Sequence, residues 1–251
     1  MTTAPTAVPT QREPALLGQT VVVIGGSSGI GLATARLARE EGADVILTGR
    51  DVDRLKQAAE AVDALRTAAF DATDFARLEQ FFNELPGTVD HVMVSGRGPY
   101  YAPLAEIDLD EARRDIEQHM FLPIQVARYS IGAVRPGGSL VLIGGTGGRR
   151  PAVGLSTISV LTAGLPALTR NLALEIAPIR VNLLAAGFVD TPLSARLLGD
   201  DIAARREQLR STLPIRRVIQ PEDVAALAVH LMINTALTGA TYDVDGGQQL
   251  L

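Results

Sequence analysis

A glycine-rich segment near the start of the chain, VVVIGGSSGIG at residues 21–31, is its clearest candidate for chemistry. Its glycines have the spacing GxxxGxG, and they follow an apolar run and precede a helical pattern. Glycines in this context let the chain turn tightly, so that backbone N–H groups at a helix N-terminus approach a pyrophosphate. The residues predicted to bind a nucleotide here are Gly25, Ser27, Ser28, Gly29, Ile30 and Gly31. A tight turn without a ligand is the alternative.

A second candidate segment, Thr48-Gly49-Arg50-Asp51, lies where the next apolar run ends. At this position a dinucleotide-binding fold distinguishes a ribose 2′-hydroxyl from a 2′-phosphate. An acidic side chain would repel the phosphate, whereas Gly49 leaves space and Arg50 offers a planar, bidentate donor. Asp51 is the competing candidate, but it also suits the N-cap of the helical pattern that follows. The segment therefore favours NADP(H) as the cofactor.

Few other side chains offer catalytic chemistry. The chain has no cysteine, which excludes disulfides, thiolate metal sites and cysteine nucleophiles. The three histidines, His91, His119 and His230, are scattered without metal-ligand spacing, so we expect no metal site. Tyr100 and Tyr101 stand in a segment with glycine and proline, after the fourth apolar run.

The elements that must position these residues follow a regular alternation. Strands are expected at residues 20–25, 44–48, 66–70, 89–94, 139–143, 180–184 and 241–244. Helices are expected at 29–41, 52–64, 74–84, 109–134, 155–176 and 221–233, with Pro136-Gly137-Gly138 and Pro178 ending the two long central ones. Repeated βαβ units of this kind predict an α/β fold, a doubly wound parallel sheet of the Rossmann type with helices on both faces.

A polar helical stretch at about residues 190–215 interrupts this alternation after the sixth strand. Ligands of open α/β sheets bind outside the carboxyl ends of the strands, so an insertion here is a candidate lid over the crevice. An ordinary pair of surface helices is the alternative.

Length and composition set the class of protein. A chain of 251 residues with 47% hydrophobic and 20% charged residues fits one large domain, which we expect over residues 16–251 after a disordered tail at 1–15. The net charge of -5 argues against a nucleic-acid partner. The tail has no apolar run suited to a signal peptide or a membrane span, so we expect a cytoplasmic protein.

Several segments together resemble the short-chain dehydrogenase/reductase family from about residue 17 to the C-terminus. Besides the two described above, they are Phe70-Asp71-Ala72-Thr73, Ile179-Arg180-Val181-Asn182, Ala186 to Thr191, and Asp243-Val244-Asp245-Gly246-Gly247. The resemblance implies that Asp71 hydrogen-bonds the adenine ring, that Ala72 lines the adenine pocket and that residues 188–191 contact the nicotinamide carboxamide. The cofactor-binding residues that it adds are Asp71, Ala72, Ser95, Gly96, Gly187, Val189 and Thr191.

The catalytic half departs from the family's pattern. The family's active-site Asn aligns with His119, its Ser with Gly145, and its Tyr and Lys with Ile158 and Thr162. In the family the Tyr exchanges the alcohol proton and the Lys lowers its pKa, and general acid-base work of this kind contributes typically ~10²–10⁴ in rate. Isoleucine cannot exchange a proton. A different proton donor is therefore needed.

Three side chains are candidate donors: His119, Tyr100 and Tyr101. A histidine has a near-neutral pKa that suits an acid, but a histidine inside a helix is often a hydrogen-bonded structural group. A phenol on the loop after the fourth strand lies where substrates bind, but it often serves for packing. The glycines of Gly144-Gly145-Thr146-Gly147-Gly148 remove side chains there, which predicts a wide cavity and a bulky substrate.

The resulting hypothesis is an NADP(H)-dependent oxidoreductase that reduces a small-molecule ketone or dicarbonyl, or oxidises the alcohol, with a non-standard proton donor. Two alternatives remain: an inactive NADP(H)-binding sensor or scaffold, and a redox-neutral lyase or isomerase on the same fold. The resemblance also implies a homodimer or homotetramer, and the apolar C-terminal Leu250-Leu251 suits burial at such an interface.

Overall fold

The computed structural model of the protein describes residues 13–251, so most of the tail expected at residues 1–15 lies outside the described part of the chain. No helix in residues 13–251 is long and apolar enough to cross a membrane.

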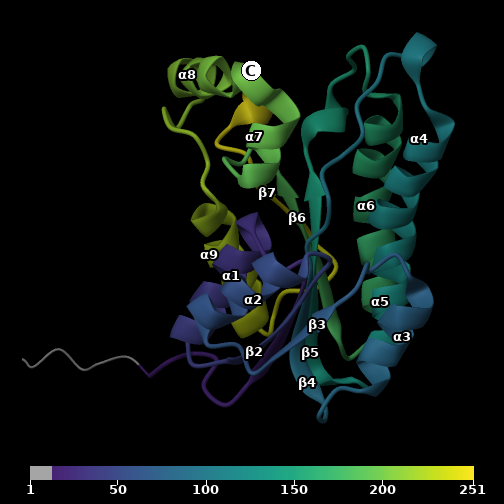
Figure 1. The fold of residues 1–251 in the computed structure, drawn as a ribbon, viewed down its shortest axis with the longest axis vertical. Helices are drawn as coiled ribbons and strands as arrows, with labels where there is room; N and C mark the ends of the chain where they lie inside the picture. Colours follow the sequence, from purple (N-terminus) through teal and green to yellow (C-terminus); the bar gives the residue numbers. More distant parts are fainter. Residues whose placement is uncertain (1–12) are drawn as a thin grey trace, which may run out of the picture.

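A parallel sheet forms the centre of the molecule (Figure 1). Within residues 13–251 it has seven strands in the order β3-β2-β1-β4-β5-β6-β7. The strands are β1 (Thr20–Ile24), β2 (Asp44–Gly49), β3 (Arg66–Ala69), β4 (Val89–Val94), β5 (Val134–Gly145), β6 (Arg180–Ala186) and β7 (Thr241–Val244). All seven residues of β6 are buried, as expected for a strand that is covered on both faces. The prediction of a doubly wound α/β fold is confirmed.

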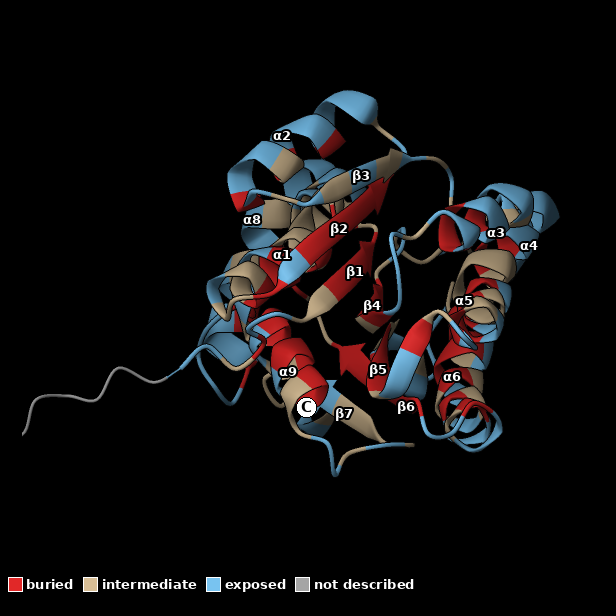
Figure 2. Cartoon of the chain, turned by 90° about the horizontal axis from the view of Figure 1, so that it is seen from below, coloured by how far each residue is buried: buried red, intermediate tan, exposed pale blue. Residues whose placement is uncertain are grey.

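Helices cover both faces of this sheet (Figures 1 and 2). One face carries α1 (Gly29–Glu40), α2 (Val52–Val62) and α9 (Pro221–Ile233). The other carries α3 (Phe75–Asn83), α4 (Leu109–Ile116), α5 (Leu122–Ser130) and α6 (Ser156–Glu175). Two further helices, α7 (Pro192–Leu198) and α8 (Ile202–Thr212), occupy the predicted insertion after β6. Each layer of helices packs its apolar face on the sheet, which gives two large clusters of buried side chains.

The helix expected over residues 109–134 differs from this prediction. It runs as α4, a π-helical turn at Glu117–Phe121 and α5, and it ends at Ser130. Pro123 is the second residue after the π turn and has no N–H to continue the usual ladder, which fits a locally widened helix. Gly132, with φ +84°, provides the left-handed turn after the helix.

Pro136-Gly137-Gly138 therefore does not end a helix, as the sequence predicted, but lies inside β5. The pairing of β4 with β5 shifts its register between Val89 and His91, beside this segment. A proline cannot donate to the sheet ladder, so an irregular register is the form in which a strand accommodates it. The strand is consequently longer than the predicted 139–143.

Candidate functional site

Two adjoining cavities open at the carboxyl ends of the strands, where the chain order reverses between β1 and β4. The smaller, of about 180 Å³, lies over the ends of β1 and β2. The larger, of about 1240 Å³, extends from the glycine-rich segment across β4, β5 and β6 to α7 and α8. We call them the small and the large cavity. Gly25, Ser28, Arg50 and Ser95 line both, so the two form one continuous site.

The glycine-rich segment is built for a close approach of backbones. Gly25 has φ +81°, and a Cβ there would stand 2.0 Å from the carbonyl oxygen of Ser95. Gly29 has φ +54° and adjoins Thr191, whose Cγ2 would lie 3.4 Å from such a Cβ. Gly31 lines neither cavity, but a Cβ there would stand 2.3 Å from the Gly25 carbonyl oxygen, so only glycine lets α1 begin so close to the turn. These contacts form the bare, tight strand-turn-helix cradle that a pyrophosphate requires.

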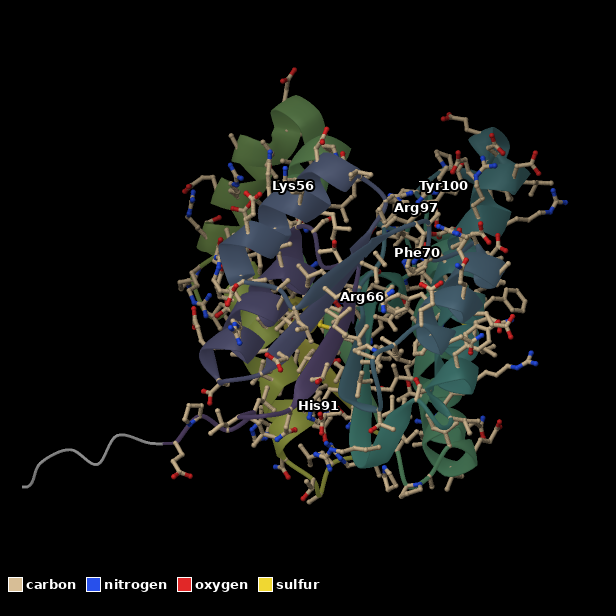
Figure 3. The ribbon with its side chains drawn as sticks, turned by 60° about the horizontal axis from the view of Figure 1, so that its bottom comes forward. Lys56, Arg66, Phe70, His91, Arg97 and Tyr100 are labelled. Atoms are coloured by element: carbon tan, nitrogen blue, oxygen red, sulfur yellow. The ribbon has the colours of Figure 1, made fainter. Side chains whose placement is uncertain are left out.

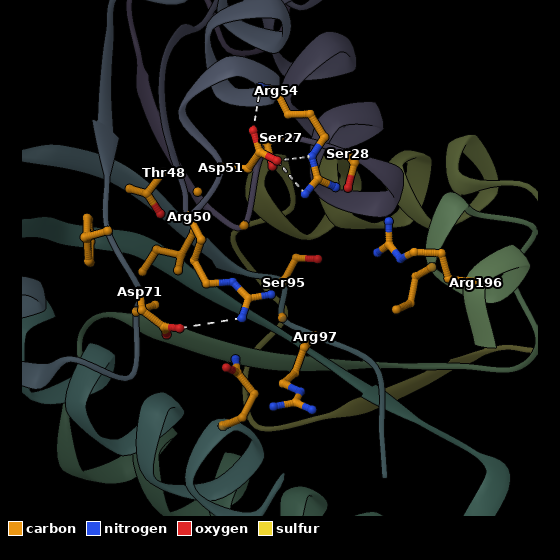
Figure 4. Close-up of a pocket in the computed structure, with 18 residues that line it drawn as sticks. Ser27, Ser28, Thr48, Arg50, Asp51, Arg54, Asp71, Ser95, Arg97 and Arg196 are labelled. Carbon is orange, nitrogen blue, oxygen red and sulfur yellow. Dashed lines mark hydrogen bonds and ion pairs between the residues drawn. The ribbon is translucent and has the colours of Figure 1, made fainter. Parts of the chain in front are cut away.

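The small cavity brings together the residues predicted for the adenosine end (Figure 4). Arg50 Nη1 lies 3.5 Å from an Asp71 carboxylate oxygen. Partial burial opposes ionisation of Asp71, but hydrogen bonds from Thr73 and the charge of Arg50 outweigh it and hold the pKa of Asp71 below its usual value. Asp51 accepts from the backbone N–H of Arg54 at 3.0 Å, which confirms it as the N-cap of α2. Ser27 and Ala72 complete the predicted set on this wall.

The other predicted cofactor residues line the large cavity. They are Ile30, Gly96, Gly187, Val189 and Thr191, with Gly25, Ser28, Gly29, Arg50 and Ser95. Gly187 packs so closely on the C-terminal segment that a Cβ there would lie 2.8 Å from Gln248 Oε1. Thr191 caps α7 by accepting from the Ser194 N–H at 3.1 Å. Apart from Gly31, the predicted cofactor residues therefore line one continuous surface.

The four positions that the resemblance aligned with the family's catalytic residues all line the large cavity. They are His119 on the π turn, Gly145 at the end of β5, and Ile158 and Thr162 on α6. A Cβ at Gly145 would meet no atom closer than 3.7 Å. The neighbouring Thr146 is fully buried, and its hydroxyl has no hydrogen-bond partner among residues 13–251. Thr146 thus has an unpartnered polar atom next to Gly145, in a residue that lines the large cavity.

His119 is held by a buried carboxylate. Its Nδ1 lies 2.9 Å from the backbone oxygen of Asp115 and 3.1 Å from Asp115 Oδ1. The Asp115 side chain is 2% exposed, and within the described chain neither of its oxygens has a hydrogen-bond partner apart from this ion-pair contact. Because both neighbours of Nδ1 are acceptors, Nδ1 carries the hydrogen and Nε2 is the ring atom left for the cavity. Proteins often place π turns, such as the one that carries His119, at functional sites.

The two tyrosines differ in their surroundings. The Tyr100 hydroxyl accepts from the backbone N–H of Asp108 at 2.8 Å, so it helps to cap α4. Tyr101 is half exposed, yet loss of water around its hydroxyl, and secondarily the charge of Asp115, raises the pKa of Tyr101. A raised pKa keeps the phenol protonated and makes it a weaker acid. Figure 3 shows Tyr100 and Arg97 at the same end of the molecule, opposite His91.

Sequence reasoning missed some residues of the site. Asp115 is one, although its spacing of four from His119 on a helical pattern was a usable signal. Arg196 of α7 lines the small cavity, and Arg205 of α8 lines the large one. Both belong to the predicted insertion, but nothing in the local sequence shows which of its arginines point inward.

Comparisons with known proteins agree with this geometry. The sequence model of a family described as "Enoyl-(Acyl carrier protein) reductase" matches residues 24–249. The chain is 28% identical to the short-chain dehydrogenase/reductase malC of Malbranchea aurantiaca, over 96% of this chain and 99% of that protein. It is 30% identical to human dehydrogenase/reductase SDR family member 4, over 95% of this chain and 90% of the relative.

Solved structures of similar proteins have the same fold. The structure of MalC Reductase/Diels-Alderase from Malbranchea aurantiaca superposes with a TM-score of 0.87 at 26% identity, covering 95% of this chain and 99% of that one. BdcA in complex with NADPH superposes with a TM-score of 0.83 at 26% identity, covering 92% and 95% of the two chains.

Proposed function

The chain belongs to the short-chain dehydrogenase/reductase family of oxidoreductases, and from that premise we propose that it is an NADP(H)-dependent enzyme that reduces a ketone or dicarbonyl, or oxidises the alcohol, with His119 as proton donor. The observation that carries the proposal is the contact between His119 Nδ1 and the buried Asp115 carboxylate, on the wall of the large cavity. This pairing supplies the acid-base group that Ile158 cannot supply.

The proton path follows from the hydrogen bonds of the ring. With its hydrogen at Nδ1 held by Asp115, His119 takes up a second proton at Nε2 and becomes positively charged. The buried Asp115 carboxylate balances that charge. Nε2 then donates to a carbonyl oxygen in the direction of reduction and takes the proton back in oxidation. Asp115 is a positioning residue, because it acts through His119.

NADP(H) fits the surface formed by the glycine cradle, Arg50 and the residues around Thr191, and its nicotinamide would supply or accept the hydride. The protein's own residues would bind and orient the cofactor and the substrate. Thr146 belongs to the wall of the large cavity, and its hydroxyl has no partner in the described chain. We propose that it hydrogen-bonds a polar group there. BdcA, a structural neighbour, is described in complex with NADPH, which supports the choice of NADP(H).

The substrate we propose is bulky. The large cavity of about 1240 Å³ holds the proposed nicotinamide end of the cofactor as well as the substrate, and its walls beyond the glycine cradle include the apolar side chains of Leu161, Leu165, Leu197 and Phe188. Bulky ketones and cyclic diketones are two substrate classes that suit a space with apolar walls.

The decisive experiment follows NADPH absorbance with purified protein and a panel of ketones, aldehydes and cyclic diketones. We expect substrate-dependent NADPH consumption, and we expect His119→Gln to lower kcat about 10²-fold or more with little change in KM. Asp115→Asn should lower kcat less than His119→Gln does. Tyr100→Phe and Tyr101→Phe serve as matched controls on the same cavity and should retain most activity.

The other outcomes separate the alternatives. Full activity of His119→Gln would place the donor elsewhere. NADPH binding without consumption across the panel would favour a sensor. Substrate turnover without a change in absorbance would favour a redox-neutral enzyme.

A further inference from the structure

Helix α7 stands between the two cavities of the site. Leu193 lines both, Arg196 lines the small cavity, and Ser194, Leu197 and Leu198 line the large one. The same short helix therefore presents one group to the proposed cofactor surface and several to the proposed substrate space.

Little in the protein itself fixes this helix. Within residues 192–198 no residue is fully buried, whereas α1 buries five. Its anchors are the Thr191 cap, a hydrogen bond that Ser194 Oγ donates to the Val189 backbone oxygen, and an approach of Leu193 and Leu197 to the loop after β4, where a Cβ at Gly98 would lie 3.0 Å from Leu193 and 3.1 Å from Leu197. A helix with so few buried contacts belongs to the least stable part of a fold, so a further contact would matter for its position.

Arg196 is available for such a contact. Four arginines line the small cavity, and three of them have carboxylate partners: Arg50 pairs with Asp71, Arg54 with Asp51, and Arg97 with Glu111. Across residues 13–251, Arg196 has neither a hydrogen bond nor an ion pair. The cavity therefore holds one arginine whose charge no neighbouring carboxylate balances.

The position of Arg196 indicates which anion it would take. Figure 4 shows its side chain extending from α7 into the pocket, on the side of Ser28 and away from the Arg50–Asp71 pair. Ser28 is the N-cap of α1, where backbone N–H groups and the helix dipole favour a phosphate. Arg50 stands at the ribose end instead. Arg196 therefore faces the region of the pyrophosphate rather than that of a 2′-phosphate.

We propose that Arg196 binds the pyrophosphate of the dinucleotide from the side opposite the glycine cradle, and that this contact fixes α7 as a wall of the large cavity. This inference rests on the proposed dinucleotide site but not on the identity of the proton donor or the substrate.

Calorimetric titration of the whole protein with NADPH and with NADH tests the contact. Because both nucleotides carry the pyrophosphate, Arg196→Gln should raise the Kd of each about tenfold. The matched control is Arg210→Gln on α8, which removes the same charge from an exposed i,i+3 pair with Glu207 and should change neither Kd more than about twofold. A higher Kd for NADPH alone would assign Arg196 to the 2′-phosphate and overturn the proposal. An unchanged Kd for both nucleotides would overturn it as well.

Hydrogen exchange of the segment 191–213 tests the effect on α7. Saturating NADPH should slow exchange of this segment in the natural protein and slow it much less in Arg196→Gln at equal occupancy. Equal protection in both would show that the cofactor orders α7 without Arg196. A natural protein that binds neither nucleotide would overturn the proposed dinucleotide site together with this inference, whereas binding without an Arg196 effect would overturn the inference alone.

Discussion

Arg50 directly follows β2, and its side chain is 62% exposed and lies 3.5 Å from Asp71. An arginine there offers two donors to a 2′-phosphate, whereas an aspartate would place a second carboxylate beside Asp71. We expect Arg50→Asp to raise the Kd of NADPH about tenfold or more and to leave the Kd of NADH unchanged or lower. Fluorescence titration with both nucleotides measures this.

Arg36→Asp, an exposed site on α1 outside both cavities, controls for the change in net charge. An equal loss of affinity for NADPH and NADH in Arg50→Asp would mean that Arg50 does not distinguish the two.

At the scale of single residues, the sequence predicted the parts of the site that follow directly from strand ends. The glycines, Arg50 and Asp71 each come just after a strand, and parallel strands bring their carboxyl ends to one edge. Asp115 and Arg196 were not predicted, because their roles depend on burial and on which side of a helix faces a cavity. Those properties arise from packing between distant segments.

The link between β6 and α9 is an element-scale feature with a measurable consequence. The buried Arg180 donates from Nη1 to the Leu231 carbonyl and from Nη2 to the Met232 carbonyl, each at 2.7 Å. These carbonyls end α9 and have no partner within the helix. Arg180→Met keeps the apolar stem but leaves them unsatisfied, so we expect a loss of about 3 kcal/mol in the free energy of unfolding.

Urea unfolding measures this loss. Arg66→Met on β3 is the matched control, because Arg66 also binds a carbonyl near a helix end, that of Glu84, but is partly exposed. It should cost less than about 1 kcal/mol. Equal losses in the two variants would contradict a special role for the buried arginine.

Helices and strands were predicted well where the hydrophobic periodicity agrees with the residues that begin or end an element. The predicted strand at 241–244 and the helix at 221–233 match β7 and α9 in both bounds. The prediction was wrong at residues 130–138, where Pro136-Gly137-Gly138 has the composition of a helix end but occupies a strand. Pairing with β4 overrides the local preference there, and no single-chain pattern records that pairing.

The stability of the whole molecule should depend on His91. This side chain is 1% exposed and sits between Ser139 Oγ and Gln19 Oε1, each at 2.8 Å. Burial lowers the pKa of His91 to about 4, against an ordinary value of about 6.5 in the unfolded chain. Between those values the unfolded state binds more protons, so stability falls as pH falls below 6.5.

We expect about 2 kcal/mol to be lost from this group between pH 7 and pH 5. Denaturant unfolding at pH 7, 6 and 5 measures it, and His91→Gln should flatten the dependence over this range. A variant that keeps the same slope would show that other groups cause it.

Association is the second whole-molecule prediction. The helical layer of α4, α5 and α6 exposes apolar side chains on its outer side, including Phe121 at 53% and Val160 at 63%. We expect the natural protein to elute as a dimer or tetramer of the 26.5 kDa chain, with these residues at an interface. Light scattering after chromatography gives the mass.

Val160→Lys should lower that mass or weaken association. Val52→Lys is the control, since Val52 is 64% exposed on α2 in the opposite layer. A monomeric natural protein, or equal effects of the two variants, would contradict this interface.

The open wall at Gly145 bears on how this fold can be re-engineered. A side-chain atom placed there would touch nothing closer than 3.7 Å, whereas one at Gly25 would collide with backbone. A Cβ at position 145 therefore has room, whereas one at position 25 has none. A side chain can therefore be introduced at position 145 without moving the main chain. The chemistry of the pocket can be changed there without changing the fold that supports it.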